Sequence, residues 1–142
     1  MKQHLVKDIM TAHVVTVTPA TTLPEARRLM TEKRIRRLPV VEDHKLVGIV
    51  SLSDVQEASP STATSLSVWE LTYLLSKLKV SEVMTADPIT VAPEMTIGEA
   101  AQHMANRKIG GLPVVDALGN LVGIVTESDI FRLVAREWGQ GL

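Results

Sequence analysis

Hydrophobic and polar positions follow a pattern along this chain that occurs twice. Residues 6–54 recur, with one additional residue, as residues 80–129. Near its start each copy carries Met-Thr-Ala, which is followed by a Thr-Val pair and then by the strings Leu-Pro-Val-Val and Gly-Ile-Val. A repeat of this length predicts two copies of one supersecondary unit that are stable together.

The apolar pattern within each copy predicts a short strand, a helix, a hairpin and a second helix. Runs of β-branched residues at 14–17 and 89–91, each followed by a proline, predict the short strands. The hairpins are expected at 38–51 and 112–126, and their strands are so continuously apolar that both faces should be buried. The additional residue of the second copy lies in the polar turn of the hairpin, where a length change moves neither strand.

Capping boxes mark where the helices begin. Thr22 and Thr96 are each followed three residues later by Glu, and apolar side chains then recur at helical spacing. The same spacing of a hydroxyl and an acid occurs at residues 51–54 and 126–129. Each hairpin should therefore run directly into a closing helix.

The two copies are joined by a polar stretch and an apolar helix. Residues 58–65 have no apolar period and predict a loop, whereas residues 66–78 are helical in pattern with apolar side chains on several faces. This helix is either sandwiched inside the monomer or part of a self-association surface. We divide the chain here, into residues 1–65 with the linker and residues 66–142 with the linker helix.

Composition sets the size of the core. The chain has 142 residues, 45% of them hydrophobic and only 3% aromatic, which predicts one aliphatic core made jointly by the two copies. The absence of cysteine excludes disulfides and thiolate metal sites, and it fits a reducing cytoplasm. No apolar run approaches the ~20 residues of a membrane span and no signal-type segment opens the chain, so we expect a soluble, cytoplasmic protein without membrane partners.

Charge and motif content favour binding over catalysis. Fifteen basic and 16 acidic side chains give a net charge of −1, which provides no general attraction to nucleic acid. No hydroxyl nucleophile has a histidine base placed by a motif, and no glycine-rich phosphate loop is present. No metal site is predicted, because metal-ligand spacing is lacking among the four histidines His4, His13, His44 and His103.

With these motifs duplicated in order, the chain resembles a tandem pair of cystathionine β-synthase (CBS) domains, a Bateman module. The linker helix around Trp69 is similar to that of the short bacterial CBS proteins of acetoin utilisation, the AcuB-like type. The resemblance implies an α/β fold in which each domain has a small, mostly three-stranded sheet with flanking helices and the domains are related by a pseudo-twofold axis. It also implies clefts between the domains that take adenine nucleotides or related adenosyl ligands.

The acids that end the Gly-Ile-Val motifs are the expected ribose ligands. By resemblance, Asp54 and Asp129 bind ribose, and a carboxylate can accept hydrogen bonds from both ribose hydroxyls. The alternative is purely structural, since the third residue of a capping box has a complete role without any ligand.

Phosphate groups are expected at the helix starts. Ser51 and Thr126 can donate to phosphate where the helix dipole favours an anion, and Arg36 and Arg37 would supply charge to the first site. The alternative for the arginine pair is a solvated basic edge. The adenine is expected to be read through backbone groups in a pocket formed by Val14, Val15, Thr16, Pro39, Ile89, Thr90, Gly110, Gly111 and Pro113.

The two copies differ where the phosphate is expected. Gly110 and Gly111 stand at the positions of Arg36 and Arg37, so the second copy allows close backbone approach but contributes no charge there. We therefore predict one stronger site that depends on the arginine pair, and one weaker or empty site.

The expected function is a regulatory module that senses an adenosyl small molecule, namely AMP, ADP or ATP, or else S-adenosylmethionine or NAD, and signals by a conformational change. No catalytic cofactor is expected. The partners would be a second copy in a homodimer, through Trp69, Leu74 and Trp138, and a separate effector protein. The main alternative is a ligand-free oligomerisation or protein-interaction module. An enzyme acting on nucleotides would need a base or a metal that the sequence does not offer.

Overall fold

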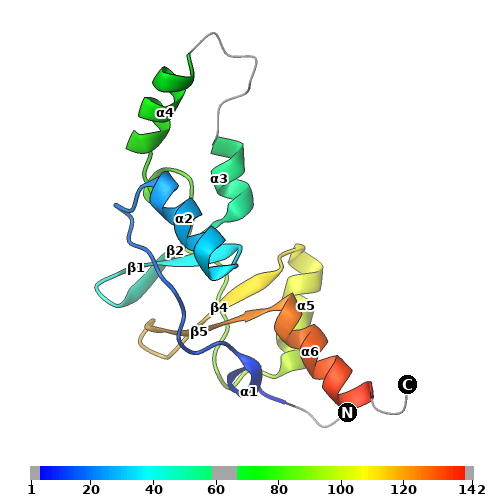
Figure 1. Ribbon diagram of the computed structural model, residues 1–142. Coiled ribbons are helices and arrows are strands. Elements are labelled where there is room, and N and C mark those ends of the chain that lie inside the picture. The colour runs from blue at the N-terminus through cyan, green and yellow to red at the C-terminus, as the bar shows by residue number, and fades with distance from the viewer. Residues whose placement is uncertain (1–3, 59–66, 140–142) are drawn as a thin grey trace. The chain divides into compact units, whose positions relative to one another are not determined.

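The computed structural model of the chain describes residues 4–58 and 67–139 (Figure 1). Apart from Ala58, the polar linker predicted at 58–65 lies outside these residues. The described chain forms two compact units with separate sets of internal contacts. We call residues 15–88 the first-repeat unit, and residues 4–14 together with 89–139 the second-repeat unit.

The first-repeat unit is built around a three-stranded antiparallel sheet of order β1-β2-β3. Helices α2 and α3 contact β1 and β2 respectively, as well as each other. In chain order the elements are α2 (Leu23–Lys33), β1 (Arg37–Glu42), β2 (Lys45–Ser51), α3 (Leu52–Ala58), α4 (Val68–Lys77), a 3₁₀ turn (Val80–Glu82) and β3 (Thr85–Ala86).

The second-repeat unit repeats this plan with a two-stranded antiparallel sheet. Helices α5 and α6 lie side by side and contact β4 and β5 respectively (Figure 1). Its elements are α1 (Val6–Ile9), α5 (Ile97–Arg107), β4 (Gly111–Val115), β5 (Leu121–Thr126) and α6 (Glu127–Trp138). The small sheets and flanking helices confirm the predicted α/β fold class.

The predicted helix starts and hairpins are confirmed. The hydroxyls of Thr22 and Thr96 accept hydrogen bonds from the backbone of Glu25 and Glu99, at 3.4 and 3.2 Å. In the first hairpin, Asp43 and His44 form a two-residue turn with φ of 51° and 67°, the left-handed values that suit a tight hairpin. The additional residue of the second repeat lies in the longer turn at 116–120, where the sequence placed it.

That longer turn is held by one side chain. The Asp116 carboxylate accepts hydrogen bonds from the backbone amides of Leu118 and Asn120, both at 2.9 Å. Gly119 adopts a φ of 84°, which a side chain would strain.

The strands predicted at 14–17 and 89–91 are reduced to single paired residues. Val17 bridges Val40, and Val91 bridges Val114, both in the parallel sense. In a parallel pairing only every second residue bonds to the same neighbour, and the next in line would be Pro19 or Pro93, which has no amide hydrogen. The prolines that signalled a strand end therefore stop the ladder after one residue.

The two repeats exchange their Met-Thr motifs. Thr85, which opens the second repeat, pairs with Ile49 of the first, and Thr11 of the first repeat pairs with Ile124 of the second. The preceding methionines pack where a glycine leaves space: a Cβ on Gly48 would lie 2.5 Å from Met84 Sδ, and one on Gly123 would lie 2.7 Å from Met10 Sδ. The compact units therefore differ in composition from the repeats along the chain.

The prediction of one joint core is wrong, because the buried aliphatic side chains form two clusters. The reason is that each hairpin is covered by its own pair of helices. One cluster comprises Val17, Leu23, Ala26, Met30, Leu38, Val40, Val50, Val55 and Val80, and the other comprises Val6, Val91, Ile97, Ala100, Met104, Leu112, Val114, Val125 and Leu133.

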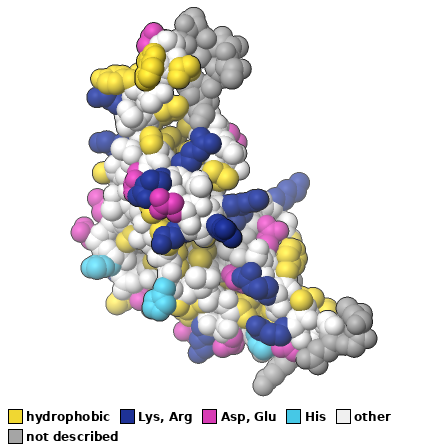
Figure 2. Space-filling view, viewed as in Figure 1, with side chains coloured by type: hydrophobic (Ala, Val, Ile, Leu, Met, Phe, Trp, Pro, Cys, Tyr) yellow, Lys and Arg dark blue, Asp and Glu magenta, His cyan; other side chains and the backbone are white. Residues whose placement is uncertain are grey.

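Helix α4 contacts α2 and has no buried residue, so in the described chain it is not sandwiched inside the monomer. Figure 2 shows hydrophobic side chains gathered over this helix, at the top of the view. None of the helices in the described ranges is long and apolar enough to cross a membrane.

Candidate functional site

The two motif acids stand in the first turns of α3 and α6 and cap these helices. Asp54 Oδ2 accepts a hydrogen bond from the Ser51 amide at 2.8 Å, while the Asp54 amide donates to Ser51 Oγ at 3.1 Å. In the second repeat, Asp129 Oδ2 accepts from the Thr126 amide at 2.8 Å, and the Asp129 amide donates to Thr126 Oγ1 at 3.4 Å. The structural role expected of a capping box is therefore present in both repeats.

The second oxygen of each acid has a different environment. Asp129 Oδ1 accepts a hydrogen bond from Arg132 Nη2 at 2.6 Å, and the Asp129 residue is only 6% exposed. Asp54 is half-buried, and its Oδ1 accepts no hydrogen bond from any described residue. The residue of the first repeat that corresponds to Arg132 is Glu57. The two acids are thus equivalent in backbone position, but the side chain three residues further on is acidic beside Asp54 and basic beside Asp129.

The arginine pair lies at the same end of the first sheet as Asp54. Arg37 is the register partner of Ser51, and the carbonyl of Arg36 accepts a hydrogen bond from the Leu52 amide at 2.8 Å. Neither guanidinium forms an ion pair or hydrogen bond with a described residue. Both guanidiniums are therefore unpaired among the described residues, at positions whose backbone adjoins the start of α3.

The corresponding glycines of the second repeat hold the same backbone positions. Gly111 pairs with Thr126, and the carbonyl of Gly110 accepts from the Glu127 amide at 3.0 Å. Both glycines are buried. The end of this sheet therefore matches the first repeat in backbone but presents no cation at these two positions.

The segments predicted to read adenine approach the same sheet ends. Because Val17 runs parallel to β1, the preceding Val15 and Thr16 lie towards the end where α3 begins; Ile89 and Thr90 lie likewise towards the start of α6. Within the described ranges, the backbone groups of these four residues form no hydrogen bond. Unpaired amides and carbonyls of this kind are what recognition of an adenine edge requires.

The remaining predicted pocket residues are placed less favourably. The carbonyls of Pro39 and Pro113 are occupied, since they accept from the amides of Val17 and Val91 at 3.0 and 3.1 Å. Both prolines are also fully buried, so their side chains present almost no surface to a ligand. Val14 belongs to the second-repeat unit rather than to the unit of Val15, so its role beside the first site stays a prediction.

Other charges are engaged elsewhere. On α2, Arg28 pairs with Glu25 and Glu32, and the hydrogen bond from Arg28 lowers the pKa of Glu25. The same hydrogen bonds, chiefly that with Glu25, raise the pKa of Arg28. The described residues contain no group of three or more His, Cys, Asp or Glu side chains that could bind a metal ion.

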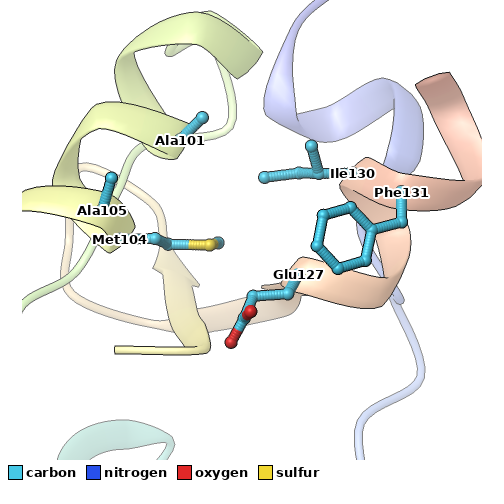
Figure 3. Close-up of a pocket in the computed structure, with 6 residues that line it drawn as sticks. All are labelled: Ala101, Met104, Ala105, Glu127, Ile130 and Phe131. Atoms are coloured by element: carbon cyan, nitrogen blue, oxygen red, sulfur yellow. The ribbon is translucent and has the colours of Figure 1, made fainter. Parts of the chain in front are cut away.

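Two hollows of the second-repeat unit are not lined by Asp129. One, of about 330 Å³, is lined by Thr90 and by the turn residues Asp116 and Ala117, at the opposite end of the hairpin. The other, of about 190 Å³, lies between α5 and α6, where Phe131 and Ile130 face Met104 (Figure 3). This second hollow is apolar apart from Glu127, so it suits an apolar side chain better than a nucleotide.

The predicted self-association residues are exposed. Trp69 is 84% exposed and Leu74 lies on the same helix, α4, of the first-repeat unit. Trp138 on α6 is 62% exposed, and Phe131 on the same helix is 66% exposed. Large apolar side chains with this exposure are unusual unless a partner covers them.

Comparison with protein families decides which fold family this geometry represents. The family model for the CBS domain matches residues 6–61 and again residues 80–136. The chain belongs to the CBS domain family. The two matches coincide with the two sequence repeats, and each contains one of the capping acids.

Relatives of this CBS pair include enzymes and short CBS proteins. An inosine-5'-monophosphate dehydrogenase of Korarchaeum cryptofilum is 45% identical over 118 residues, which are 83% of this chain but only 22% of the dehydrogenase. A CBS domain-containing protein of Dictyostelium discoideum is 35% identical over 93% of this chain and 92% of its own length. The chain therefore matches a part of the enzyme but most of the short protein.

Solved structures show the same architecture. The CBS domain pair of protein MJ0100, in complex with 5'-methylthioadenosine and S-adenosyl-L-methionine, has a TM-score of 0.80 at 31% identity, covering 96% of this chain and 99% of that pair. CBSX2 in complex with AMP has a TM-score of 0.80 at 33% identity, with 94% and 98% covered. An acetoin utilization protein (AcuB) from Vibrio cholerae also has a TM-score of 0.80, at 36% identity, with 97% and 95% covered. The predicted resemblance to a CBS pair, including an AcuB-like one, is confirmed.

The sequence analysis did not predict two features in or near the second-repeat site. The Arg132–Asp129 ion pair could have been found by comparing the repeats three residues beyond each motif acid, where Glu57 stands opposite Arg132. The hollow beside Phe131 has no such signal, because it depends on the spacing of two packed helices.

Proposed function

We propose that this CBS pair is a regulatory module that binds an adenosyl ligand, with its stronger site in the first-repeat unit. The observation that supports the proposal is that residues with unpaired groups suited to ribose, phosphate and adenine have their backbone at one end of the first sheet. These groups are Asp54 Oδ1, the guanidiniums of Arg36 and Arg37, and the backbone of Val15 and Thr16. The complexes of the MJ0100 pair and of CBSX2 with adenosyl compounds support this ligand class.

Each group has a distinct role in the proposal. Asp54 accepts hydrogen bonds from the ribose hydroxyls through its open oxygen, while its other oxygen keeps capping α3. Ser51 and the arginine pair hold phosphate, where charge-assisted hydrogen bonds are strongest. The candidate ligands are AMP, ADP and ATP, with S-adenosylmethionine and NAD as further candidates. Thr126 and Asp129 occupy the same positions in the weaker site.

Signalling follows from differential binding. A ligand can favour one conformation of the pair only by the difference in its affinity for the two states. We propose that the CBS pair itself is not catalytic, and that its output passes to an effector protein or through the shape of a homodimer.

The proposal is tested by calorimetric titration with AMP and by thermal shift with AMP, ADP, ATP, S-adenosylmethionine and NAD. A ligand at about 100 times its dissociation constant stabilises the protein by about 2.7 kcal/mol. Asp54→Asn should abolish the stronger site without unfolding α3, since an asparagine oxygen can still accept from the Ser51 amide. Glu99→Gln is the matched control, because Glu99 stands at the same helix position in α5.

A second candidate function is a ligand-free oligomerisation module. The observation that favours it is that both motif acids already complete a capping box without any ligand. If no compound of the panel shifted the unfolding temperature and the protein formed a stable oligomer, this candidate would be supported instead.

We also propose that the chain forms a homodimer through α4 and α6. The exposure of Trp69, Leu74 and Trp138 supports a second copy as the partner, and Phe131 extends the apolar surface of α6. Burial of such side chains contributes about 25 cal/mol per Å² of apolar surface.

A further inference from the structure

The carboxylate of Asp129 has most of its hydrogen-bonding capacity in use. Oδ2 accepts from the Thr126 amide at 2.8 Å and from Thr126 Oγ1 at 3.1 Å, and Oδ1 accepts from Arg132 at 2.6 Å. A carboxylate has about four acceptor positions, so three are filled. A ribose diol that binds Oδ1 must share this oxygen with Arg132 or displace the guanidinium.

The two members of this ion pair differ in burial, so one of them can move more easily than the other. Asp129 is 6% exposed at its side chain, whereas Arg132 is 68% exposed. The acid is held in place by its cap, and the arginine can swing into solvent at little cost. Arg132 is therefore the movable member of the pair.

The first repeat carries the opposite charge at the same place. Glu57 follows Asp54 by three residues, as Arg132 follows Asp129. On a helix, side chains three apart are neighbours, so Asp54 has an acid beside it where Asp129 has a cation. Nothing in the described chain competes for Asp54 Oδ1.

We propose that Arg132 is a specificity-determining residue that blocks the ribose position of the second site by holding Asp129 Oδ1. The inference rests on the proposed function, and it assigns the weakness of the second site to its ribose end as well as to the glycines at its phosphate end. Removing Arg132 frees the oxygen, and installing an arginine at position 57 blocks the first site in the same way.

The test isolates one site at a time with AMP as the probe in calorimetric titration. In an Asp54→Asn background, where AMP binds only the second site, Arg132→Ala should strengthen AMP binding about fivefold, the factor that corresponds to ~1 kcal/mol for a partly exposed ion pair. Arg132→Lys should change the affinity much less, because a cation remains beside Asp129.

The reciprocal variant separates competition from a structural effect. In an Asp129→Asn background, Glu57→Arg should weaken AMP binding at the first site about fivefold, with an unfolding temperature in the absence of AMP that is not lowered. A merely structural role for Arg132 predicts the reverse for its own variant, since losing the ion pair would destabilise α6 and weaken binding.

Each outcome decides between the two proposals. If the wild type binds AMP but Arg132→Ala leaves the second site unchanged or weaker, the role of Arg132 is overturned and the proposed function stands. If the wild type and every variant fail to bind any adenosyl compound of the panel, the proposed function falls and this inference falls with it.

Discussion

At the residue scale, the side chain of Asp54 leaves room for the proposed binding role beside its structural one. One carboxylate oxygen completes the cap of α3, and the other accepts nothing from the described residues. The two interpretations of this acid are therefore compatible, because a carboxylate has more acceptor positions than a cap uses. In Asp129 both oxygens accept hydrogen bonds, so the same motif leaves fewer acceptor positions open to a ligand.

Replacing both arginines of the first site should weaken binding in proportion to the charge of the ligand. For Arg36→Ala with Arg37→Ala, we expect at least a tenfold loss for ATP and almost no change for adenosine, since charge-assisted hydrogen bonds to phosphate are lost. Calorimetric titration with both ligands measures the difference. Arg27→Ala with Lys33→Ala is the control, because it removes the same charge from exposed positions of α2; equal losses in the two double variants would contradict the assignment.

The motif residues could be predicted from the sequence because the repeat itself aligns them. Asp54 with Asp129, and Arg36 with Gly110, are found by counting along the chain, and the sheet register places them at equivalent ends. The sequence could not predict which backbone groups are already hydrogen-bonded. The carbonyls of Pro39 and Pro113, for example, each accept a hydrogen bond from a single parallel bridge. Such a bridge depends on packing between distant segments rather than on local pattern.

At the scale of elements, the helices and hairpins were predictable and the short parallel segments were not. Capping residues and apolar periodicity are local signals, so α2, α5 and both hairpins begin and end close to the expected positions. The stretches around Val17 and Val91 have strand composition, but a following proline limits each to one bridge. Helix α4 was recognised as a helix, while its exposure in the single chain shows that apolar composition alone does not establish burial.

Charged substitutions on α4 should dissociate the proposed homodimer. Trp69→Glu with Leu74→Glu places two charges on a surface that a second copy would bury, so sedimentation should shift from dimer to monomer while the unfolding curve of the monomer stays similar. Gln56→Glu on the exposed side of α3 serves as the control. A wild type that sediments as a monomer at all accessible concentrations would refute the surface.

At the scale of the whole molecule, the exchange of Met-Thr motifs ties each repeat to the other. Val6, at the start of the chain, is fully buried in the core that otherwise consists of residues 91–133. Val80, at the start of the second repeat, is fully buried in the core of the first-repeat unit. The correspondence of the two cores follows from the repeat, but the sequence alone did not reveal which copy of each segment fills which core.

Shortening each of these two valines should destabilise the unit that is formed mainly by the other repeat. Val6→Ala should lower the free energy of unfolding of the second-repeat unit by about 2 kcal/mol, and Val80→Ala should do the same to the first-repeat unit, because each leaves a cavity in a packed core. Hydrogen exchange resolved by peptide should locate the loss at β4 and β5 for Val6→Ala, and at β1 and β2 for Val80→Ala. If each substitution reduced hydrogen-exchange protection only in the repeat that carries it, the crossing of these segments between the repeats would be contradicted.

The exchanged segments also set an order for biosynthesis. As the ribosome releases the chain, the first hairpin and its two helices emerge well before Val80 and Thr85, which complete their core and sheet. Val6 and Thr11 emerge earlier still, and Ile124, the partner of Thr11, is made more than 100 residues later. Both unfinished cores therefore expose apolar surface in the nascent chain until these segments are made, a period in which chaperone contact matters most.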